Sequence, residues 1–222
     1  MGVLISSVII ILWSSHLYYC MKFVTPDFTN IFTYFHILIQ TFFYTGLFIT
    51  AHDSMHGTVS SNKKINYFTG ALACFLFAGM SYKKLLANHK LHHNSPGTES
   101  DPDFYHGSDN FFIWWSVFLK RYVTLFQILY MALIFNLLKL YFAEISVWLF
   151  FVLPSVLSTL QLFYFGTYLP HRRPHSHDML PFNSRTEKKN HLYAFVTCYF
   201  FGYHSEHHKS PQTPWWKMYS LK

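Results

Sequence analysis

Charged residues are scarce in this chain of 222 residues, where they make up 12% of the sequence against 51% hydrophobic residues. A soluble domain carries about 25% charged residues, so this composition excludes an ordinary water-soluble protein. The cysteines are also few: Cys20, Cys74 and Cys198 are odd in number and widely spaced, which argues against a disulfide framework or a CxxC metal site. The composition indicates a membrane protein.

Long apolar stretches predict how the chain crosses the bilayer. Two of them, at about 31–51 and 145–169, reach the roughly 20 apolar residues that a crossing needs. Two more, at about 3–19 and 123–142, are also predicted to cross. Pro154 is expected to kink the last crossing.

Two apolar stretches are too short to cross. Those at 65–80 and 192–203 favour re-entrant or interfacial helices. No linker or repeat divides the chain, so we expect one membrane-embedded domain over residues 1–222. The predicted fold class is therefore all-α, an integral membrane protein with about four transmembrane helices and short re-entrant or interfacial helices.

The basic residues test this topology. With four crossings, Lys22 and Lys139 lie on one side of the membrane and the other fifteen of the 17 Lys and Arg residues lie on the opposite side, together with both termini. By the positive-inside rule the basic side faces the cytoplasm, in a bacterial inner membrane or a thylakoid or plastid membrane. The net charge of +7 then follows from topology and does not indicate nucleic-acid binding, although it favours acidic protein partners.

Histidine, by contrast, is abundant, with 15 residues, and eight of them form three clusters on the basic side. At a frequency of about 0.07, chance would give the pattern His-x-x-His-His about 0.07 times in this chain, yet it occurs twice. Residues three or four apart share one face of a helix, so each cluster can direct two or three imidazoles at one ion. The clusters are His52 and His56, then His89, His92 and His93, and then His204, His207 and His208.

The number of imidazoles indicates how many ions they serve. A single tetrahedral ion uses about four protein ligands, so eight histidines exceed what one ion needs. The spacing therefore predicts a dinuclear, nitrogen-rich centre. It does not select the metal, because imidazole suits Zn, Cu, Fe and Ni alike.

The clusters and their surroundings resemble a known family. They are similar to the histidine boxes of the membrane fatty-acid desaturase and hydroxylase superfamily of non-haem di-iron oxygenases, and within it to beta-carotene ketolases. The likeness extends from about residue 40 onward. It rests on His52-Asp53-Ser54-Met55-His56-Gly57, on the second box continuing into the Pro-Gly-Thr-Glu-Ser-Asp-Pro-Asp-Phe run of residues 96–104, on Leu169-Pro170-His171-Arg172, on residues 201–208 and on Pro214-Trp215-Trp216.

The resemblance implies two iron ions (Fe2+), O2 as co-substrate and electrons from a reduced ferredoxin. The implied reaction oxidises the C4 methylene of a carotenoid β-ionone ring to a ketone, from beta-carotene to echinenone and canthaxanthin, and by extension from zeaxanthin to astaxanthin. General acid–base catalysis cannot activate a ring C–H bond, so such a reaction requires a redox metal.

Site residues follow from the boxes and their neighbours. The eight clustered histidines are the implied iron ligands, and His171, which follows the last crossing on the same side, is a ninth candidate. Five carboxylates lie in or close behind the boxes and are expected to hold the second nitrogen of ligand imidazoles: Asp53, Asp101 and Glu206, with Glu99 and Asp103 beside them. For Asp101 and Asp103, turn chemistry beside Pro102 is an equally good explanation.

The remaining histidines and the aromatic residues receive weaker assignments. His16 and His36 have no cluster partner in sequence, and interfacial packing is expected of them, as of His106 and His191. His175 and His177 lie in a polar loop, where they are expected either to face solvent or to contact the ligand histidines without binding metal themselves. Aromatic runs at 42–48 and 163–168 either line a slot for a long polyene or pack against lipid, and Trp114, Trp115, Trp215 and Trp216 are expected to form an interfacial belt.

Other functions remain open at this point. A fatty-acid desaturase, an alkane hydroxylase or a carotenoid hydroxylase would use the same boxes, although the short His-x-x-x-His first box and the Pro-Gly-Thr-Glu run favour a ketolase. From a different class, the chain could be a membrane metal transporter or a metal-storage protein. Transport normally places ionisable groups within the spans, whereas here the acids lie at helix ends and in loops.

Overall fold

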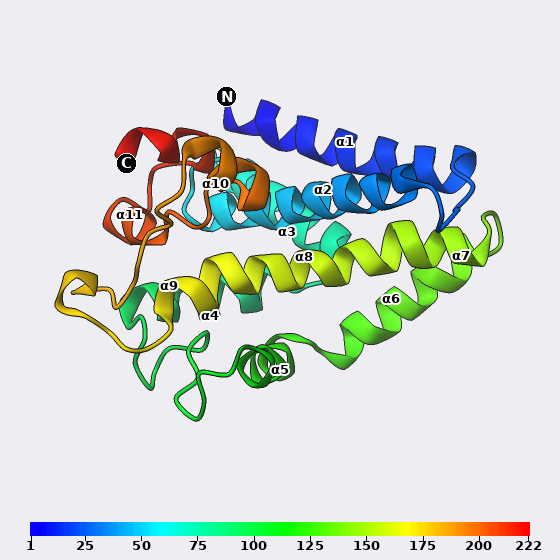
Figure 1. The fold of residues 1–222 in the computed structure, drawn as a ribbon. Helices are drawn as coiled ribbons and strands as arrows, with labels where there is room; N and C mark the ends of the chain where they lie inside the picture. The colour runs from blue at the N-terminus through cyan, green and yellow to red at the C-terminus, as the bar shows by residue number, and fades with distance from the viewer.

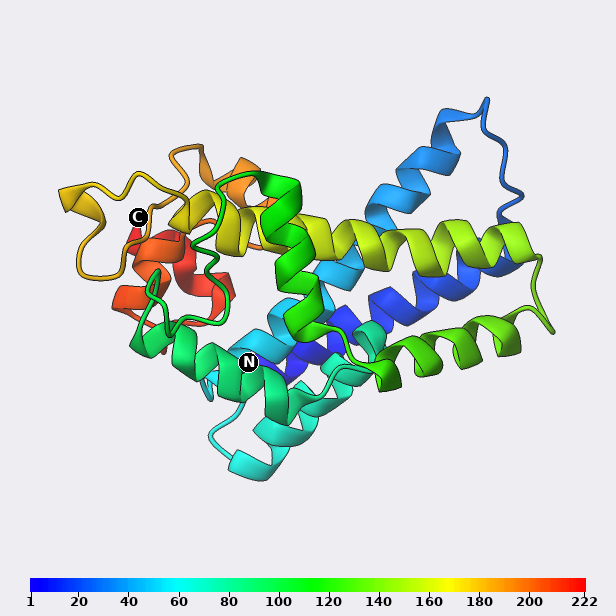
Figure 2. The ribbon, with the colours of Figure 1, turned by 90° about the horizontal axis from the view of Figure 1, so that it is seen from below.

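In the computed structural model, which describes residues 1–222, the chain folds into helices with no strand. Three segments are long and apolar enough to cross a membrane: α1 (Gly2–Phe23), α2 (Ile31–Met55) and the segment Glu144–His171. They run along the long axis of the molecule (Figures 1 and 2), with α2 packed against both of the others. This arrangement confirms the predicted all-α class with membrane-type helices.

The third long segment is interrupted twice without losing its helical path. It consists of α7 (Glu144–Val147), α8 (Leu153–Phe163) and α9 (Leu169–His171), joined by π-helical turns at Trp148–Val152 and Tyr164–Tyr168. Each π turn lies just before a proline, Pro154 or Pro170, whose ring has no N–H and crowds the carbonyl four residues earlier. At Pro154, where the sequence predicts a kink, the structure has the first of these π-helical turns.

A bent helix pair dips into the bundle from the end where α2 finishes. α3 (Lys63–Ala78) meets α4 (Tyr82–Asn94) at 103°, and α4 returns the chain to the same end. Gly79 at the bend has a φ of +65°, and a Cβ there would lie 2.5 Å from the ring of Tyr130. Glycine is therefore needed for both the backbone conformation and the close approach. The pair contains the short apolar helix predicted at 65–80.

A second bent pair departs from the prediction. α5 (Phe111–Tyr122) and α6 (Leu125–Leu138) meet at 90°, so that α5 appears end-on in Figure 1 while α6 runs along the bundle. The crossing predicted at 123–142 contains only the 14 residues of α6, about 21 Å of helix, which is shorter than a full span. The reason is local: Thr124 and Gln127 form a capping box that starts the helix at Leu125.

Short elements cover one end of the bundle. They are a 3₁₀ turn at His177–Met179, α10 (His191–Cys198), α11 (His204–Lys209) and a 3₁₀ helix at Trp215–Leu221, and α10 is the short helix predicted within 192–203. Both termini lie toward this end, while the α1–α2 and α6–α7 connections lie at the other (Figure 1). The two termini therefore lie at the same end, where the four predicted crossings would place them, although three segments are long and apolar enough to cross.

The helices are joined by aromatic packing and a few polar contacts. Trp13 of α1 packs edge-on against Tyr44 of α2, with ring centroids 5.4 Å apart. The Thr45 hydroxyl contacts Ser158 at 2.9 Å and donates to the Gln161 side chain at 2.6 Å, which links α2 to α8. Such contacts stabilise helix pairs in lipid, where apolar surface gains little from burial.

One tryptophan departs from the predicted interfacial belt. Trp114 is fully buried, where it packs against Phe104 and Phe163. Its indole N–H donates to the backbone carbonyl of Asp103 at 2.8 Å. A buried indole with a satisfied N–H is a packing residue, and here it supports the loop behind the second histidine box.

Candidate metal centre

The nine predicted histidines lie at the end of the bundle that carries the termini, and their ring nitrogens form two groups. Within each group, one ligand atom from each residue lies within 4.8 Å of the others. The groups adjoin, because the rings of His93 and His208 have centroids 4.5 Å apart. The five-histidine group contains His52, His56, His89, His93 and His207, and the four-histidine group contains His92, His171, His204 and His208.

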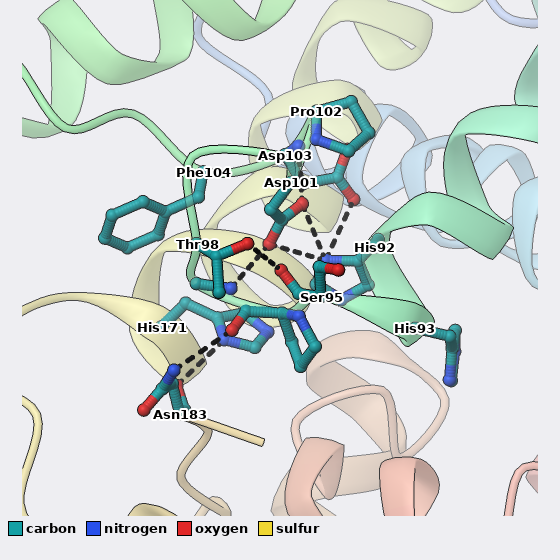
Figure 3. Close-up of polar contacts among 12 residues, drawn as sticks. His92, His93, Ser95, Thr98, Asp101, Pro102, Asp103, Phe104, His171 and Asn183 are labelled. Carbon is teal, nitrogen blue, oxygen red and sulfur yellow. Dashed lines mark hydrogen bonds and ion pairs between the residues drawn. The ribbon is translucent and has the colours of Figure 1, made fainter. Parts of the chain in front are cut away.

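The pattern His-x-x-His-His divides between the groups in a regular way. On α4, His89 and His93 belong to the five-histidine group while His92 belongs to the other; Figure 3 shows His93 set apart from His92. On α11 the assignment is reversed, with only His207 in the five-histidine group. Residues four apart point nearly the same way on a helix, whereas the intervening residue is turned away by about 100°. Each of these helices therefore serves both groups.

The nitrogens face one another in a way that protons alone cannot satisfy. In the four-histidine group, the Nε2 atoms of His92, His204 and His208 lie 3.1 to 3.3 Å apart. In the other group, Nε2 of His56 lies 2.7 Å from Nε2 of His89. For metal–nitrogen bonds of about 2.1 Å and angles of about 90° to 110°, neighbouring ligand nitrogens would lie about 3.0 to 3.4 Å apart. The donor set thus fits transition-metal ions.

Two further Nε2 atoms support this fit. Those of His52 and His171 are buried and have no hydrogen-bond partner. The Nδ1–H of His171 donates to the backbone carbonyl of Asn183 at 2.9 Å (Figure 3), so its Nε2 carries a lone pair. A buried acceptor without a donor costs free energy, which a bound cation would remove.

Asp101 makes the contacts that both of its predicted roles require. Both of its carboxylate oxygens lie 3.0 Å from Nδ1 of His92, so that His92 donates there and keeps Nε2 free. The backbone N–H groups of Gly97 and Asp103 each donate to the same carboxylate at 2.8 Å (Figure 3). Burial alone would raise the pKa of Asp101, but the hydrogen bonds from His92 and the backbone lower it below its usual range.

The orienting hydrogen bonds predicted for Asp53 and Glu206 are absent. The nearest oxygen of Asp53 lies 3.8 Å from Nδ1 of His52, too far for a hydrogen bond, and its carboxylate instead accepts the backbone N–H of Trp215 at 3.2 Å. The Glu206 carboxylate has no histidine partner, and its Oε2 is buried without a hydrogen bond. A carboxylate one position from a ligand points about 100° away along the helix and cannot reach that ring.

The sequence also predicts an orienting role for Asp103, and for Glu99, which is exposed, but none for Asn183. Asp103 lies 3.8 Å from Nδ1 of His92 and accepts a hydrogen bond from the Tyr122 hydroxyl, and burial raises its pKa to about 6. The Asp-Pro-Asp run points to Asp103 beside Asp101. Asn183 acts through its backbone carbonyl, for which no sequence signal exists.

The histidines outside the two groups separate into packing and surface positions. His175 donates to the backbone carbonyl of His171 at 2.8 Å, and His177 is exposed. His191 contacts the Tyr203 hydroxyl at 3.0 Å, and His106 packs against Phe104. His16 and His36 lie at the other end of the bundle and are described below.

The surroundings of the α11 histidines favour the neutral form of the imidazole. Burial lowers the pKa values of His204, His207 and His208 well below the ordinary 6.5, and neighbouring imidazoles lower them further. These rings are therefore neutral at pH 7, the form that binds metal.

An apolar cavity of about 130 Å³ leads to the centre. Its wall includes His52 and His89 from the five-histidine group and His92 and His204 from the other, so both groups are reached from one space. The rest is mainly hydrophobic, with the aromatic side chains Phe48, Phe77, Phe118, Phe163 and Phe201. One residue from each aromatic run, Phe48 and Phe163, thus lines a slot, whereas Tyr44 belongs to the helix core.

Comparison with known proteins gives consistent matches. The family model described as "Fatty acid desaturase" matches residues 29–145 and 116–222. A zeaxanthin 4-ketolase of Chlamydomonas reinhardtii is 43% identical over 182 residues, which cover 80% of this chain and 41% of the relative. A beta-carotene ketolase of Paracoccus sp. (strain N81106 / MBIC 01143) is 38% identical over 187 residues, 82% of this chain and 76% of the relative.

A longer alignment reaches nearly the whole chain. A beta-carotene 4-ketolase of Protosiphon botryoides is 35% identical over 246 residues, 98% of this chain and 62% of the relative. The chain therefore spans about two fifths of the Chlamydomonas relative and about three fifths of the Protosiphon one. No solved structure matches the chain.

The metal-free protein should lose stability in mild acid. Histidines of the unfolded chain titrate near 6.5, whereas those of α11 stay neutral when folded, so below that pH the unfolded state binds more protons. The free energy of unfolding should therefore decrease as pH falls below about 6.5, by up to about 1.4 kcal/mol per histidine per pH unit. Thermal unfolding measured from about pH 7.5 to 5.5 tests this. His207→Asn should flatten the dependence and the exposed His177→Asn should not; a flat wild-type curve would contradict the burial argument.

Asp101→Asn should weaken metal retention. The amide no longer offers two anionic oxygens to His92 Nδ1–H, and loss of such an outer contact lowers metal affinity by about 10- to 100-fold. Metal content after dialysis against a graded chelator measures the effect. Asp53→Asn is the matched control, because Asp53 accepts a hydrogen bond from the Trp215 backbone and none from a histidine. Equal losses in the two variants would rule out the orienting role of Asp101.

Proposed function

This chain belongs to the beta-carotene ketolases of the fatty acid desaturase family, and from this premise we propose that it oxidises the C4 methylene of a carotenoid β-ionone ring to a ketone. The observation that carries the proposal is the apolar cavity whose wall includes histidines of both groups. A hydrocarbon ring that enters it lies against the metal-binding end of the bundle. The site therefore suits an apolar substrate that has no ionisable group.

The nine histidines are the proposed ligands of two iron ions. Such ions, when bound, supply the redox chemistry by which O2 oxidises an unactivated C–H bond. The chain's own part is to direct the Nε2 atoms at two points, with Asp101 fixing the ring of His92 and the Asn183 carbonyl fixing the ring of His171. Fixed rings keep their geometry without reorganisation, which is how outer contacts tune a metal site.

The cavity places and isolates the substrate. Ala78 and Met80 at the first bend, and Leu119 and Val123 at the second, line it together with α8. It therefore lies between the two bent pairs, beside helices that are apolar enough for the membrane interior, where a carotenoid dissolves. The apolar wall excludes water from the ring, and the aromatic side chains pack against its methyl groups.

Relatives support the choice of substrate. They are named for ketolation of zeaxanthin and of beta-carotene. We assign beta-carotene as the substrate, with echinenone and canthaxanthin as successive products, and conversion of zeaxanthin to astaxanthin as the related reaction. The polar side chains of Gln127, Thr159 and Thr167 in the cavity wall can hydrogen-bond a 3-hydroxyl group.

The electron donor is proposed to be a reduced ferredoxin that docks on the basic face. Lys90 on α4 and Lys209 on α11 are exposed on helices that carry the ligand histidines. An acidic protein is attracted to this face and brings its redox centre close to the metal groups. The same face is the proposed cytoplasmic side, as the distribution of Lys and Arg predicts.

Carotenoid analysis in a host that makes beta-carotene tests the activity. The wild-type chain should give 4-keto products with a reddened pigment, whereas His92→Ala should give none, because it removes a ligand that Asp101 holds in place. His177→Ala, at an exposed position, should keep full conversion. Ring-hydroxylated carotenoids alone, or desaturated fatty acids with unchanged beta-carotene, would overturn the ketolase assignment in favour of another reaction of the family.

Charge reversal tests the donor face. Lys90→Glu combined with Lys209→Glu should raise the KM for ferredoxin several-fold, with a weakened dependence on salt, because exposed interface charges act mainly on association. Lys22→Glu, at the far end of α1, is the matched control and should leave the KM unchanged. An unchanged KM in the double variant would place the donor elsewhere.

A further inference from the structure

A second cluster of metal-binding side chains lies near the opposite end of the bundle, away from the nine histidines. His16 and Cys20 lie one turn apart on α1, and His36 faces them from α2. The three ligand atoms lie within 4.8 Å of one another. The sequence predicts only interfacial packing for His16 and His36. It does not show that they meet, because the contact between them forms only when α1 and α2 pair.

Two of the ligand atoms are separated as in a coordination sphere. Nε2 of His16 lies 3.2 Å from Nδ1 of His36, and two metal–nitrogen bonds of about 2.05 Å at a tetrahedral angle give about 3.3 Å. Sγ of Cys20 lies 3.6 Å from Nε2 and 3.8 Å from Nδ1 of His16, beside the ring, so the Cys20 side chain must rotate to bring its sulfur in front of Nε2. With that rotation the three atoms can bind one ion.

A buried glutamine holds His16 in the tautomer that a metal requires. Oε1 of Gln40 accepts the Nδ1–H of His16 at 2.6 Å, and its amide nitrogen donates to the backbone carbonyl of Trp13 at 3.3 Å. Gln40 is completely buried, so this contact is not shared with solvent. His16 therefore has an Nε2 lone pair, which faces Nδ1 of His36. An orienting acceptor of this kind is the usual partner of a metal-bound imidazole.

The surroundings decide the charge of the ion. His16 lies seven residues before the end of α1, about 10 Å from it, within a helix whose outer side chains are apolar. A thiolate and two neutral imidazoles carry a charge of −1, so a monovalent ion gives a neutral site and a divalent ion leaves a charge of +1. Uncompensated charge within a membrane is costly, and thiolate ligands favour Cu(I).

We propose that Nε2 of His16, the thiolate of Cys20 and Nδ1 of His36 bind one Cu(I) ion. The Cys20 S–H bond breaks as the S–Cu bond forms, the proton leaves to solvent, and no electron is transferred. Cys20 is fully buried between the helices, so the ion would link α1 to α2 near their connecting loop. This site does not depend on the proposed ketolase activity.

Competition for Cu(I) tests the proposal in the iron-loaded protein in lipid nanodiscs. A chromogenic Cu(I) chelator under anaerobic, reducing conditions should reveal one tightly held ion per chain. Cys20→Ser should lower the affinity at least tenfold, and Gln40→Leu by about 10- to 100-fold through His16. Cys74→Ser is the matched control, because Cys74 is a buried cysteine on α3 outside the cluster. Copper X-ray absorption should show a sulfur neighbour in the wild type and the control, and none in Cys20→Ser.

The same measurements can overturn the proposal. Equal Cu(I) affinity in Cys20→Ser and Cys74→Ser, or coordination by nitrogen alone in the wild type, would refute this site. Tighter binding of Zn(II) than of Cu(I) at the cluster would refute the monovalent assignment. Retained iron and cooperative thermal unfolding identify a folded variant. If Cys20→Ser does not fold, His36→Phe replaces it, since His36 is only half-buried and its ring size is nearly kept.

Discussion

The rest of this structure depends on the mutual repulsion of imidazole lone pairs brought together at one end of a helix bundle. Nε2 atoms from the end of α2, from α4 and from α11 face one another at hydrogen-bond distance, with too few protons to pair them all, and a ring nitrogen of His171 on α9 lies within 4.8 Å of the others in its group. Burial makes protonation unfavourable as well, so a cation is the species that satisfies them. The helix bends, the π turns and the short covering helices together bring four separate helices to this end of the bundle.

Much of the candidate site could be predicted because helical spacing carries it. The box histidines recur three and four residues apart, which identifies them as neighbours on helices whatever the tertiary fold. The roles of the acids were harder, since Asp53 and Glu206 are adjacent to ligands in sequence but point sideways from them in space. Asp101 reaches His92 because it lies in a loop that folds back, and the Asp-Pro-Asp run marks such a turn.

What could not be predicted depends on pairing between segments. Hydropathy located the long helices, yet it missed the break at Thr124, where a capping box redirects an apolar stretch. It also gave no sign that His36 would meet His16 across the α1–α2 contact. The buried Trp114 shows the same limit: an aromatic residue near an interface in sequence is placed by whichever helices surround it.

The reversed division of the two His-x-x-His-His patterns has a consequence for how metal ions would be taken up. Because α4 gives two rings to one group and one to the other, and α11 does the opposite, neither helix can shift without disturbing both histidine groups. The first ion to arrive would restrict both helices and leave the second group already assembled, at a reduced entropic cost. Occupancy of the two positions would then rise together, and half-filled protein would be a minor species.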